Sequence, residues 1–458
     1  MGAGASAVSE ELPFNPDSIP TDGVKVSYLN EFLEAIGGRE KLEGLTTTEV
    51  NEQFQMPITA KTKSSMCQLL KHINHPAVGE SQVFISHAWR YNFLNVIDAL
   101  LYHFRNEPDT IIWFDVFSNN QHKIGNLEYD FFETNFRENV DRMKRTVLVS
   151  SPWNNPIPYT RAWCIFEMYA TAITNSTFEI AMSDVDKKQF IEDIEEKTKD
   201  TMNKMLSVID AKKSECWKSE DRVLIFKAIE NSVGFGKINE MVFEQLRDFV
   251  IAEGKKALDE NTDESRISSL KNMLGELYQG QGKYEHAISL FEDSWKTNTE
   301  QKGEKNQDTL QSMSNFANTL RYQGKYDLAL PLSQDCLAKR EETLGESHPD
   351  TLTSLNNLAI LYDKQGKYDL AESFHVKCLA KREETLGESH PDTLMSLGNL
   401  ADLYYMQGKY DRAESFYVKC LAKQEETLGE SHPDTVRTKR NYEIFLKAKQ
   451  QRAEQANT

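Results

Sequence analysis

A repeat with a period of 42 residues in the last third of the chain constrains the fold more than any other feature. The tetrapeptide Gln-Gly-Lys-Tyr ends at four equally spaced residues: Tyr284, Tyr326, Tyr368 and Tyr410. A second motif, Ser-His-Pro-Asp-Thr, recurs with the same period and contains Asp350, Asp392 and Asp434. A period in this range predicts a solenoid, because each unit needs its neighbours in order to bury a core.

Each unit is predicted to be a helix, a glycine turn and a second helix. Apolar residues fall at helical spacing on both sides of Gly366 and of its counterparts. Small residues recur where two helices must approach closely: Gly275, Ala317, Ala359 and Ala401 in the first helix, and Ala287, Ala329, Ala371 and Ala413 in the second. Cys336, Cys378 and Cys420 share the period and are predicted to be buried. We therefore expect an all-α array over residues 259–450, closed by a C-terminal capping helix, with a tail over residues 451–458.

This pattern of small and aromatic residues resembles tetratricopeptide repeats. The unit is longer than usual, and its extra length falls in Leu-Ala-Lys-Arg-Glu-Glu-Thr-Leu-Gly-Glu-Ser-His-Pro-Asp-Thr. With this segment, the array closely resembles the repeats of kinesin light chains over residues 265–450. Association with kinesin itself is not expected, because residues 183–258 lack the sustained heptads of a coiled coil.

Stacked helix pairs form a concave groove that such arrays use for extended peptides. A column of asparagines recurs in the first helices: Asn315, Asn357, Asn399 and Asn441. An amide offers both a donor and an acceptor to a peptide backbone. The alternative is that these amides cap or bridge helices within the array. We favour a peptide-binding role, with a protein or peptide partner in the groove.

Residues 81–182 alternate between strand and helix patterns. The predicted strands are 82–86, 110–115, 146–150 and 178–182, and the predicted helices are 92–104, 129–143 and 162–173. This alternation predicts an α/β domain with a flavodoxin-like parallel sheet. Residues 183–258 are predicted to be a helical connector. Residues 1–80 are interpreted as a tail and helical lead-in with a helix over 26–35, and residues 7–80 have no assigned role.

Polar residues follow the predicted strands, at the sheet edge where parallel α/β folds bind ligands. Ser86, Trp89 and Arg90 follow the first strand, and Asp115 ends the second. Ser151 and Trp153 follow the third strand. These six residues are the candidate substrate-binding residues.

Two segments of this region resemble a divergent TIR (Toll/interleukin receptor-like) domain. Val83-Phe84-Ile85-Ser86 is similar to the first strand of that family, and Trp163-Cys164-Ile165-Phe166-Glu167 is similar to the tryptophan-cysteine-x-x-glutamate motif of its NAD-cleaving members. The resemblance implies that Glu167 is catalytic and that the domain self-associates. The loop 116–125 lacks the arginine-aspartate and proline-glycine pairs usual in the family.

Glutamate suits this chemistry, because cleavage of the nicotinamide–ribose bond passes through an oxocarbenium-like state that a carboxylate stabilises. NAD would be the substrate, and no cofactor or metal is expected. One hypothesis is a signalling protein that hydrolyses NAD to nicotinamide and an ADP-ribose product, with repeats that bind a partner. The alternative is a non-enzymatic TIR/tetratricopeptide adaptor for protein–protein interaction. The Glu167 motif favours the enzyme, and the altered loop favours the adaptor.

Charge and composition exclude some other functions. The formal net charge of −18 disfavours nucleic acid as a partner. No secretory signal pattern is present, so we expect a cytoplasmic protein whose six cysteines stay reduced. Cys67, His72 and His75 lie close together, but no second ligand pair follows at zinc-site spacing, so no metal site is predicted.

The chain begins Met-Gly-Ala-Gly-Ala-Ser, which fits the pattern for N-myristoylation at Gly2. A disordered start rich in small residues is the alternative. A single myristoyl chain binds membranes only marginally, and no basic patch follows it. We therefore expect weak and reversible membrane contact.

Overall fold

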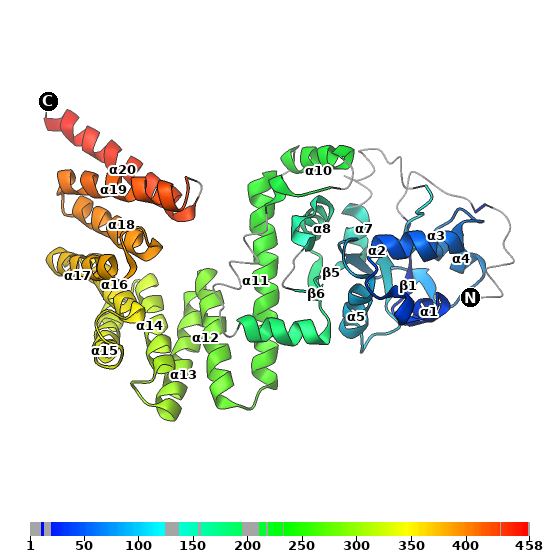
Figure 1. Ribbon diagram of the computed structural model, residues 1–458, viewed down its shortest axis with the longest axis horizontal. Helices are drawn as coiled ribbons and strands as arrows, with labels where there is room; N and C mark the ends of the chain where they lie inside the picture. Colours follow the sequence, from blue (N-terminus) through cyan, green and yellow to red (C-terminus); the bar gives the residue numbers. More distant parts are fainter. Residues whose placement is uncertain are drawn as a thin grey trace. The chain divides into compact units, whose positions relative to one another are not determined.

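The computed structural model describes residues 11–12, 20–123, 137–153, 157–194, 210–216, 219–231, 233–430 and 432–456. The chain divides into two compact units, Met1–Ala257 and Leu258–Thr458. Figure 1 shows strands in the first unit and consecutive helices in the second. Gly2 lies outside the described residues.

The first unit contains a six-stranded mixed sheet in the order β2-β1-β4-β3-β5-β6. Strands β3, β4, β5 and β6 are parallel to one another, whereas β1 pairs antiparallel with β4 on one side and with β2 on the other. The four parallel strands follow the flavodoxin-like order, in which the first strand lies between the second and the third. The strand bounds are β1 (Asp22–Lys25), β2 (Val78–Glu80), β3 (Val83–Ser86), β4 (Ile111–Phe114), β5 (Arg145–Val149) and β6 (Thr177–Ala181).

The predicted α/β class is confirmed, but the sheet is not wholly parallel. The parallel strands were readable because their residues form mostly apolar runs, and every residue of β3 is buried. β1 has only four residues, Asp-Gly-Val-Lys, and so gives no such signal. Gly23 in β1 approaches the next strand closely, since a Cβ there would lie 2.2 Å from the carbonyl oxygen of Ile112.

Short helices before β2 complete the core of this unit. Helix α1 begins at Tyr28 within the predicted 26–35 helix, and Tyr28, Leu29, Phe32 and Leu33 are buried. The Phe32 ring meets Phe117 edge to face at 4.8 Å. Residues 20–80 therefore share the core of the sheet. The helices are α1 (Tyr28–Ala35), α2 (Thr47–Val50), α3 (Met56–Thr59), α4 (Met66–His72), α5 (Phe93–His103), α6 (Asp115–Ser118), α7 (Arg137–Met143) and α8 (Ala162–Ile173).

Most of the described part of the segment predicted to be a helical connector is helical, but residues 210–216 hold only a short 3-10 turn, Ala211–Lys213, and Glu215 forms an isolated bridge with Arg161. Residues 184–194 are helical, followed by α10 (Ser219–Asn231) and the 27-residue α11 (Gly234–Glu260). Buried residues of α11 recur every four positions at Ile238, Val242, Leu246 and Val250. This spacing places one apolar stripe on one face of the helix.

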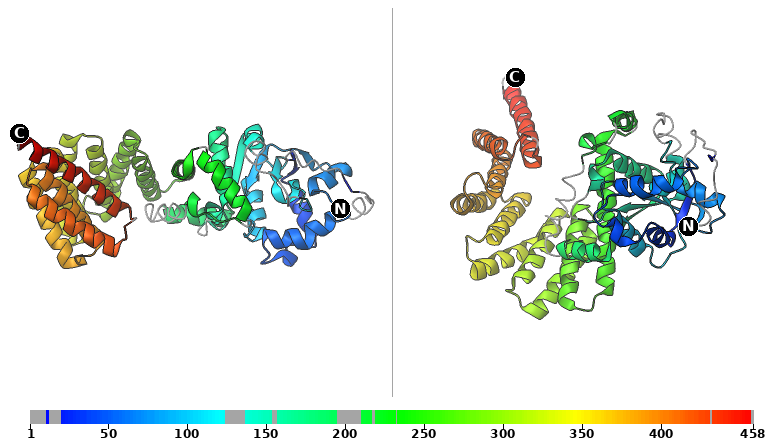
Figure 2. Two further views of the ribbon diagram at one scale, coloured as in Figure 1. Left: turned by 90° about the horizontal axis from the view of Figure 1, so that it is seen from above. Right: turned by 45° about the vertical axis from the view of Figure 1, so that its right-hand side comes forward.

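The second unit is a series of antiparallel helix pairs, which confirms the predicted all-α array. In both views of Figure 2 the successive helices α14 to α19 lie side by side in chain order. The bounds are α12 (Glu264–Gly280), α13 (Tyr284–Lys302), α14 (Gln307–Tyr322), α15 (Tyr326–Leu344), α16 (Pro349–Lys364), α17 (Tyr368–Leu386), α18 (Pro391–Met406), α19 (Tyr410–Thr427) and α20 (Pro433–Ala456).

The two repeated motifs form the ends of these helices. The glycine of Gln-Gly-Lys-Tyr has a positive φ, +72° at Gly366, which explains why a residue without a side chain recurs there. In Ser-His-Pro-Asp-Thr, His348 caps α16 because its Nδ1 accepts a hydrogen bond from the Asp350 amide at 3.2 Å. The following proline occupies the first helical position, which needs no amide donor.

The recurring small residues are buried, as predicted. Ala287, Ala329, Ala371 and Ala413 are each 0% exposed. Cys378 is also 0% exposed, and its thiol donates to the Leu352 carbonyl at 3.5 Å. Within the described ranges, no helix is both long and apolar enough to cross a membrane.

Candidate functional site

The carboxyl ends of the parallel strands bring several predicted residues together. Ser86 ends β3, Asp115 follows β4, and Glu167 lies in the second turn of α8, the helix after β5. The Ser86 hydroxyl donates a hydrogen bond to Glu167 Oε2. Trp89 Nε1 donates to Asp115 Oδ2 at 2.5 Å. Together with His87, these four residues are called the strand-edge site below.

Burial controls the electrostatics of this site. The Glu167 side chain keeps part of its surface accessible, but protein surrounds its carboxyl group, and this burial raises its pKa to about 8. The charge of Asp115 also raises the pKa of Glu167, whereas the hydrogen bond from Ser86 lowers it. Burial likewise raises the pKa of Asp115. Two carboxyl groups in one poorly solvated site therefore favour retention of a proton near neutral pH.

His87 adds a further group to the strand-edge site. Its Nδ1 lies 3.5 Å from Asp115 Oδ1, and burial lowers the pKa of its imidazole, so the ring is neutral near pH 7. Among the described residues, His87 Nε2 has no hydrogen-bond partner. Cys164 donates from its thiol to the His87 carbonyl at 3.5 Å, which joins α8 to the end of β3.

The other predicted substrate-binding residues have partners outside the strand-edge site. Arg90 lies 3.3 Å from Glu215 in an exposed ion pair. The Ser151 hydroxyl donates to Asp186 Oδ2. The Trp153 ring is 9% exposed and meets Phe190 edge to face at 5.4 Å. Arg90, Ser151 and Trp153 are therefore held by contacts within the protein.

Asp186, the partner of Ser151, was not among the predicted site residues. A signal was available, because Ser183 and Asp186 have the Ser-x-x-acid spacing of a helix N-terminal cap. The Asp186 amide donates to Ser183 Oγ at 3.1 Å, and Ser183 Oγ donates to Asp186 Oδ2 at 2.9 Å. The glutamate that pairs with Arg90 lies 125 positions further along the chain, and no local pattern could identify it.

Three of the four predicted peptide-binding asparagines bridge neighbouring first helices. Asn315 Nδ2 donates to Asn272 Oδ1 at 3.2 Å, and Asn399 Nδ2 donates to Asn356 Oδ1 at 3.0 Å. Asn441 Nδ2 donates to Asp402 Oδ2 at 3.2 Å. These are the bridges named above as the alternative. All four asparagines remain partly accessible, and Asn357 lines a small crevice with Asn318 and Arg321.

Asn399 and Asn441 also line the larger pocket of the array, with a volume of about 290 Å³. It lies among helices α16 to α20 and is called the α16–α20 pocket below. Its lining is Ile360, Asp363, Lys364, His375, Asn399, Asp402, Tyr405, Met406, Tyr417, Asn441 and Ile444. Nine of these eleven residues come from the first helices of their pairs.

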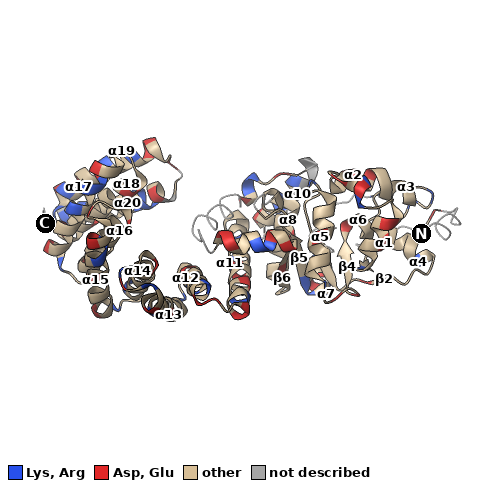
Figure 3. Ribbon diagram, turned by 60° about the horizontal axis from the view of Figure 1, so that its bottom comes forward, with Lys and Arg blue, Asp and Glu red and all other residues tan. Residues whose placement is uncertain are grey.

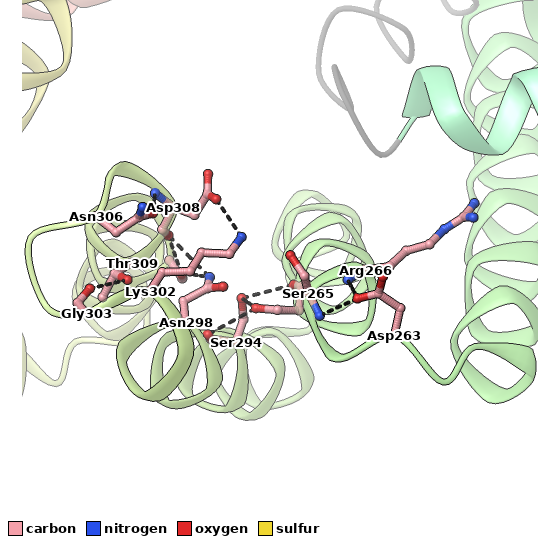
Figure 4. Close-up of polar contacts among 12 residues, drawn as sticks. Asp263, Ser265, Arg266, Ser294, Asn298, Lys302, Gly303, Asn306, Asp308 and Thr309 are labelled. Atoms are coloured by element: carbon pink, nitrogen blue, oxygen red, sulfur yellow. Dashed lines mark hydrogen bonds and ion pairs between the residues drawn. The ribbon is translucent and has the colours of Figure 1, made fainter.

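A buried polar column holds each helix pair to the next. Figure 4 shows Asn298 and Lys302 of α13 reaching Asp308 at the start of α14. In later units the position of Asn298 is taken by Arg340, Arg382 and Gln424. Arg382 is 2% exposed and donates to the Asp392 carbonyl and to Ser396 Oγ, each at 2.8 Å. The contacts of Arg382 join α17 to α18, two of the helices that line the pocket.

The exposed charges of the second helices are paired with those of the preceding unit. Lys339 lies 2.9 Å from Glu304, Lys381 lies 2.9 Å from Glu346, and Lys423 lies 2.7 Å from Glu388. Figure 3 shows acidic and basic residues intermixed on these helices. No group of three or more His, Cys, Asp or Glu residues in the described ranges is placed to hold a metal ion.

Comparison with known proteins identifies the repeats. The Tetratricopeptide repeat family matches residues 265–341, 308–384 and 364–426. The array is therefore built from tetratricopeptide repeats. The match does not include the sheet-containing unit, whose likeness to TIR domains rests on the motifs given above. No curated protein matches the chain.

Several solved structures are similar to parts of the chain. A candidate kinesin light chain of Podosopora anserina, with nearly identical TPR-like repeats, is 26% identical, with 43% of this chain and 92% of that chain covered and a TM-score of 0.37. BtubC (BKLC) from P. vanneervenii is 18% identical, with 54% and 92% covered and a TM-score of 0.35. A Rap protein complexed with competence and sporulation factor is 14% identical, with 57% and 86% covered and a TM-score of 0.35.

Proposed function

We propose that this is a cytoplasmic signalling protein with two activities. Its TIR-like unit hydrolyses NAD to nicotinamide and an ADP-ribose product, and its tetratricopeptide repeats bind a peptide of a partner protein. The observation that carries the enzymatic part is the position of Glu167. Its carboxyl group lies at the strand-edge site, accepts a hydrogen bond from Ser86, and has a pKa raised to about 8.

The raised pKa suits a cationic substrate. The nicotinamide ring of NAD carries a positive charge, and a cation close to a carboxyl group lowers the pKa of that group. Substrate binding would therefore ionise Glu167. The carboxylate would then stabilise the positive charge that develops on the ribose as the glycosidic bond breaks. The bond electrons leave with neutral nicotinamide, and water adds to the ribose carbon and loses a proton.

Nearby residues of the strand-edge site have supporting roles in this proposal. Ser86 orients the Glu167 carboxylate through its hydroxyl. Asp115 holds the Trp89 indole, whose ring offers a flat surface for the nicotinamide. NAD is a substrate in this scheme, and the residues require no metal. Self-association of this unit and weak membrane contact through an acylated Gly2 belong to the same proposal.

NAD consumption by the purified full-length chain tests the enzymatic part. The protein is concentrated or tethered on beads to force association, and released nicotinamide is measured for the wild type and Glu167→Ala. Glu192→Ala is the matched control, because Glu192 is an exposed glutamate of the same unit. We expect release that Glu167→Ala abolishes and Glu192→Ala preserves. No release from assembled, folded wild-type protein would refute the hydrolase.

A non-enzymatic adaptor is the second candidate. The observation that favours it is the engagement of Ser151 by Asp186 and of Trp153 by Phe190, which leaves two predicted substrate contacts occupied within the fold. The adaptor shares the peptide-binding part of the proposal. Absence of NAD turnover together with peptide binding would establish it.

Peptide binding is supported by the tetratricopeptide repeats and by the partly accessible asparagine column. The Rap protein named above was solved with a bound factor, competence and sporulation factor. The test incubates the full-length chain with a bead-displayed library of random peptides and sequences the retained peptides. We expect retention that falls in the double variant Asn399→Ala, Asn441→Ala, with the helical circular dichroism signal unchanged.

A further inference from the structure

Two adjacent repeat units are nearly identical, and most of the positions where they differ line the α16–α20 pocket. Residues 337–378 and 379–420 align without gaps and differ at seven positions. The pairs are Thr353 and Met395, Asn356 and Gly398, Ile360 and Asp402, Asp363 and Tyr405, Lys364 and Met406, Leu370 and Arg412, and His375 and Tyr417. In four of these pairs both members line the pocket. The residues that pack the helices together are thus repeated from one unit to the next, whereas four positions of the pocket lining are not.

The divergent positions give the pocket two carboxyl groups. Asp402 accepts hydrogen bonds from the Tyr417 hydroxyl at 2.5 Å and from Asn441 Nδ2 at 3.2 Å. Asp363 has a different environment, since it accepts no hydrogen bond from the described part of the array. Its nearest cation is Lys364, 3.9 Å away. Burial raises the pKa of both aspartates.

The basic groups near the pocket do not neutralise both acids. Lys364 is 54% exposed, so its ammonium group is largely solvated. Arg437 of α20 acts on Asp402 and lies 2.9 Å from Asp434, with which it is paired. His375 adds no charge, because burial and the nearby Arg382 lower the pKa of its imidazole to about 4.

His375 is a second and independent sign of a ligand site. Its side chain lines the pocket and is 2% exposed, and its Nδ1 lacks a hydrogen-bond partner among the described residues. A buried polar atom without a partner costs stability, and the tyrosine at the same position in the next unit avoids this cost by bonding to Asp402. His375 Nδ1 therefore remains available to form a hydrogen bond with a ligand in the pocket.

The rim of the pocket is apolar. Met406 is 57% exposed and Ile444 is 48% exposed, and both line the pocket, so they offer apolar surface beside its two carboxyl groups. A lysine or arginine has the matching pattern, because its methylene stem packs on apolar surface while its charged end seeks a carboxylate.

From this combination we propose that the α16–α20 pocket binds the cationic side chain of a lysine or arginine in the partner peptide. Asp363 is the principal acceptor, and Asp402, already held by Tyr417 and Asn441, is the second. Met406 and Ile444 contact the methylene stem. This inference rests on the proposed peptide binding. It adds the chemical class of the peptide residue that the pocket recognises.

The test uses the full-length chain and the bead-displayed peptide library, with Asp363→Asn and Asp363→Tyr as variants. Asparagine removes the charge at nearly constant shape, and tyrosine is the residue that the next unit carries at this position. Asp369→Asn, an exposed acid on α17, is the matched control. We expect lysine or arginine enrichment at one peptide position with the wild type and the control, and loss of that enrichment in both variants.

An enriched peptide is then resynthesised with norleucine in place of its basic residue. The wild type should bind the basic peptide about 10-fold more tightly than the norleucine peptide, which corresponds to about 1.4 kcal/mol. Asp363→Asn should bind the two peptides with affinities within about two-fold of each other. The interaction is thereby assigned to one pair of side chains.

Other outcomes overturn the inference in distinguishable ways. Peptides retained without basic enrichment, or enrichment unchanged in both variants, would leave peptide binding intact and refute the cationic pocket. Retention of no peptide by the folded chain would refute peptide binding and this inference with it. Binding of free cadaverine without basic enrichment among peptides would show that the occupant is a small amine rather than a peptide side chain.

Discussion

The strand-edge site and the α16–α20 pocket both hold buried carboxyl groups, but they were identified in different ways. Glu167 lies in a unit that is not repeated within the chain. Its importance is therefore indicated only by resemblance to other proteins and by its pKa of about 8. Asp363 and Asp402 lie in units that are otherwise almost identical, so the chain supplies its own reference. In a repeat protein, comparison of the units within one sequence therefore distinguishes residues that maintain the fold from residues that bind a ligand. A domain present in a single copy offers no such comparison.

The largest expected effect concerns the strand-edge site. Glu167→Gln removes the negative charge while keeping the shape, so turnover of NAD should fall by about 100-fold or more, the usual loss when one electrostatic stabiliser is removed. Nicotinamide release under tethered conditions measures this. Turnover equal to that of the Glu192→Ala control would mean that Glu167 is only a structural acid, and the comparison of the two sites would lose its first member.

The next largest effect concerns the frame of the array. Arg382→Ala leaves the Asp392 carbonyl and Ser396 without their buried donor and opens a cavity, so the free energy of unfolding should fall by about 2–4 kcal/mol. Arg382→Gln, which copies Gln424 of the next unit, should cost less than half as much. Urea denaturation followed by circular dichroism gives both values. Equal losses of unfolding free energy in the two variants would show that the residue at position 382 cannot be exchanged for its counterpart in the next unit.

A smaller effect depends on pH. The folded-state pKa of Glu167 is about 8 against an ordinary value of 4.5, so the folded chain binds more protons than the unfolded chain between these values. Stability from this group is therefore greatest below pH 4.5 and declines as the pH rises to 8. Glu167→Gln should be more stable than wild type by at least about 1 kcal/mol at pH 9, with little difference at pH 4.5. Equal stability at both pH values would show that the carboxyl group is well solvated.

The smallest effect is expected at the paired surface charges. Lys423→Met removes an exposed ion pair with Glu388, and such pairs contribute little. We expect no measurable change in melting temperature and no change in peptide selection. A change in selection would place part of the recognition surface on the second helices, and would weaken the contrast between frame and pocket.

The sequence predicted the elements that carry strong periodic or apolar signals. The four parallel strands were recognisable as apolar runs, and the helix pairs followed from the 42-residue period. β1 and β2 were missed because three or four residues with glycine and charged neighbours lack a strand pattern. β1 is placed in the sheet by its pairing with β4, and β2 by its pairing with β1, and both contacts join residues that lie far apart in the chain.

The candidate sites were predicted unevenly for a similar reason. Ser86 was named because parallel strands end at one edge of the sheet, and Glu167 was named from a motif, but neither signal predicted the hydrogen bond that joins them. The asparagine column was visible, but its bridges depend on neighbours that change from Asn272 to Asn356 to Asp402. The α16–α20 pocket was not predicted, because the 42-residue period reflects what the units share, whereas much of the pocket lining comes from positions where they differ.

The near identity of residues 337–378 and 379–420 has a consequence for how such a chain changes over generations. Unequal recombination between the two coding segments would delete or add one whole unit, and the stack would still close because most of the joining residues are the same. The α16–α20 pocket would not survive unaltered, since its lining is drawn from unlike neighbours. The binding specificity of the pocket depends on which two units are adjacent. The order of the units therefore determines specificity, whereas the number of units determines whether the array folds.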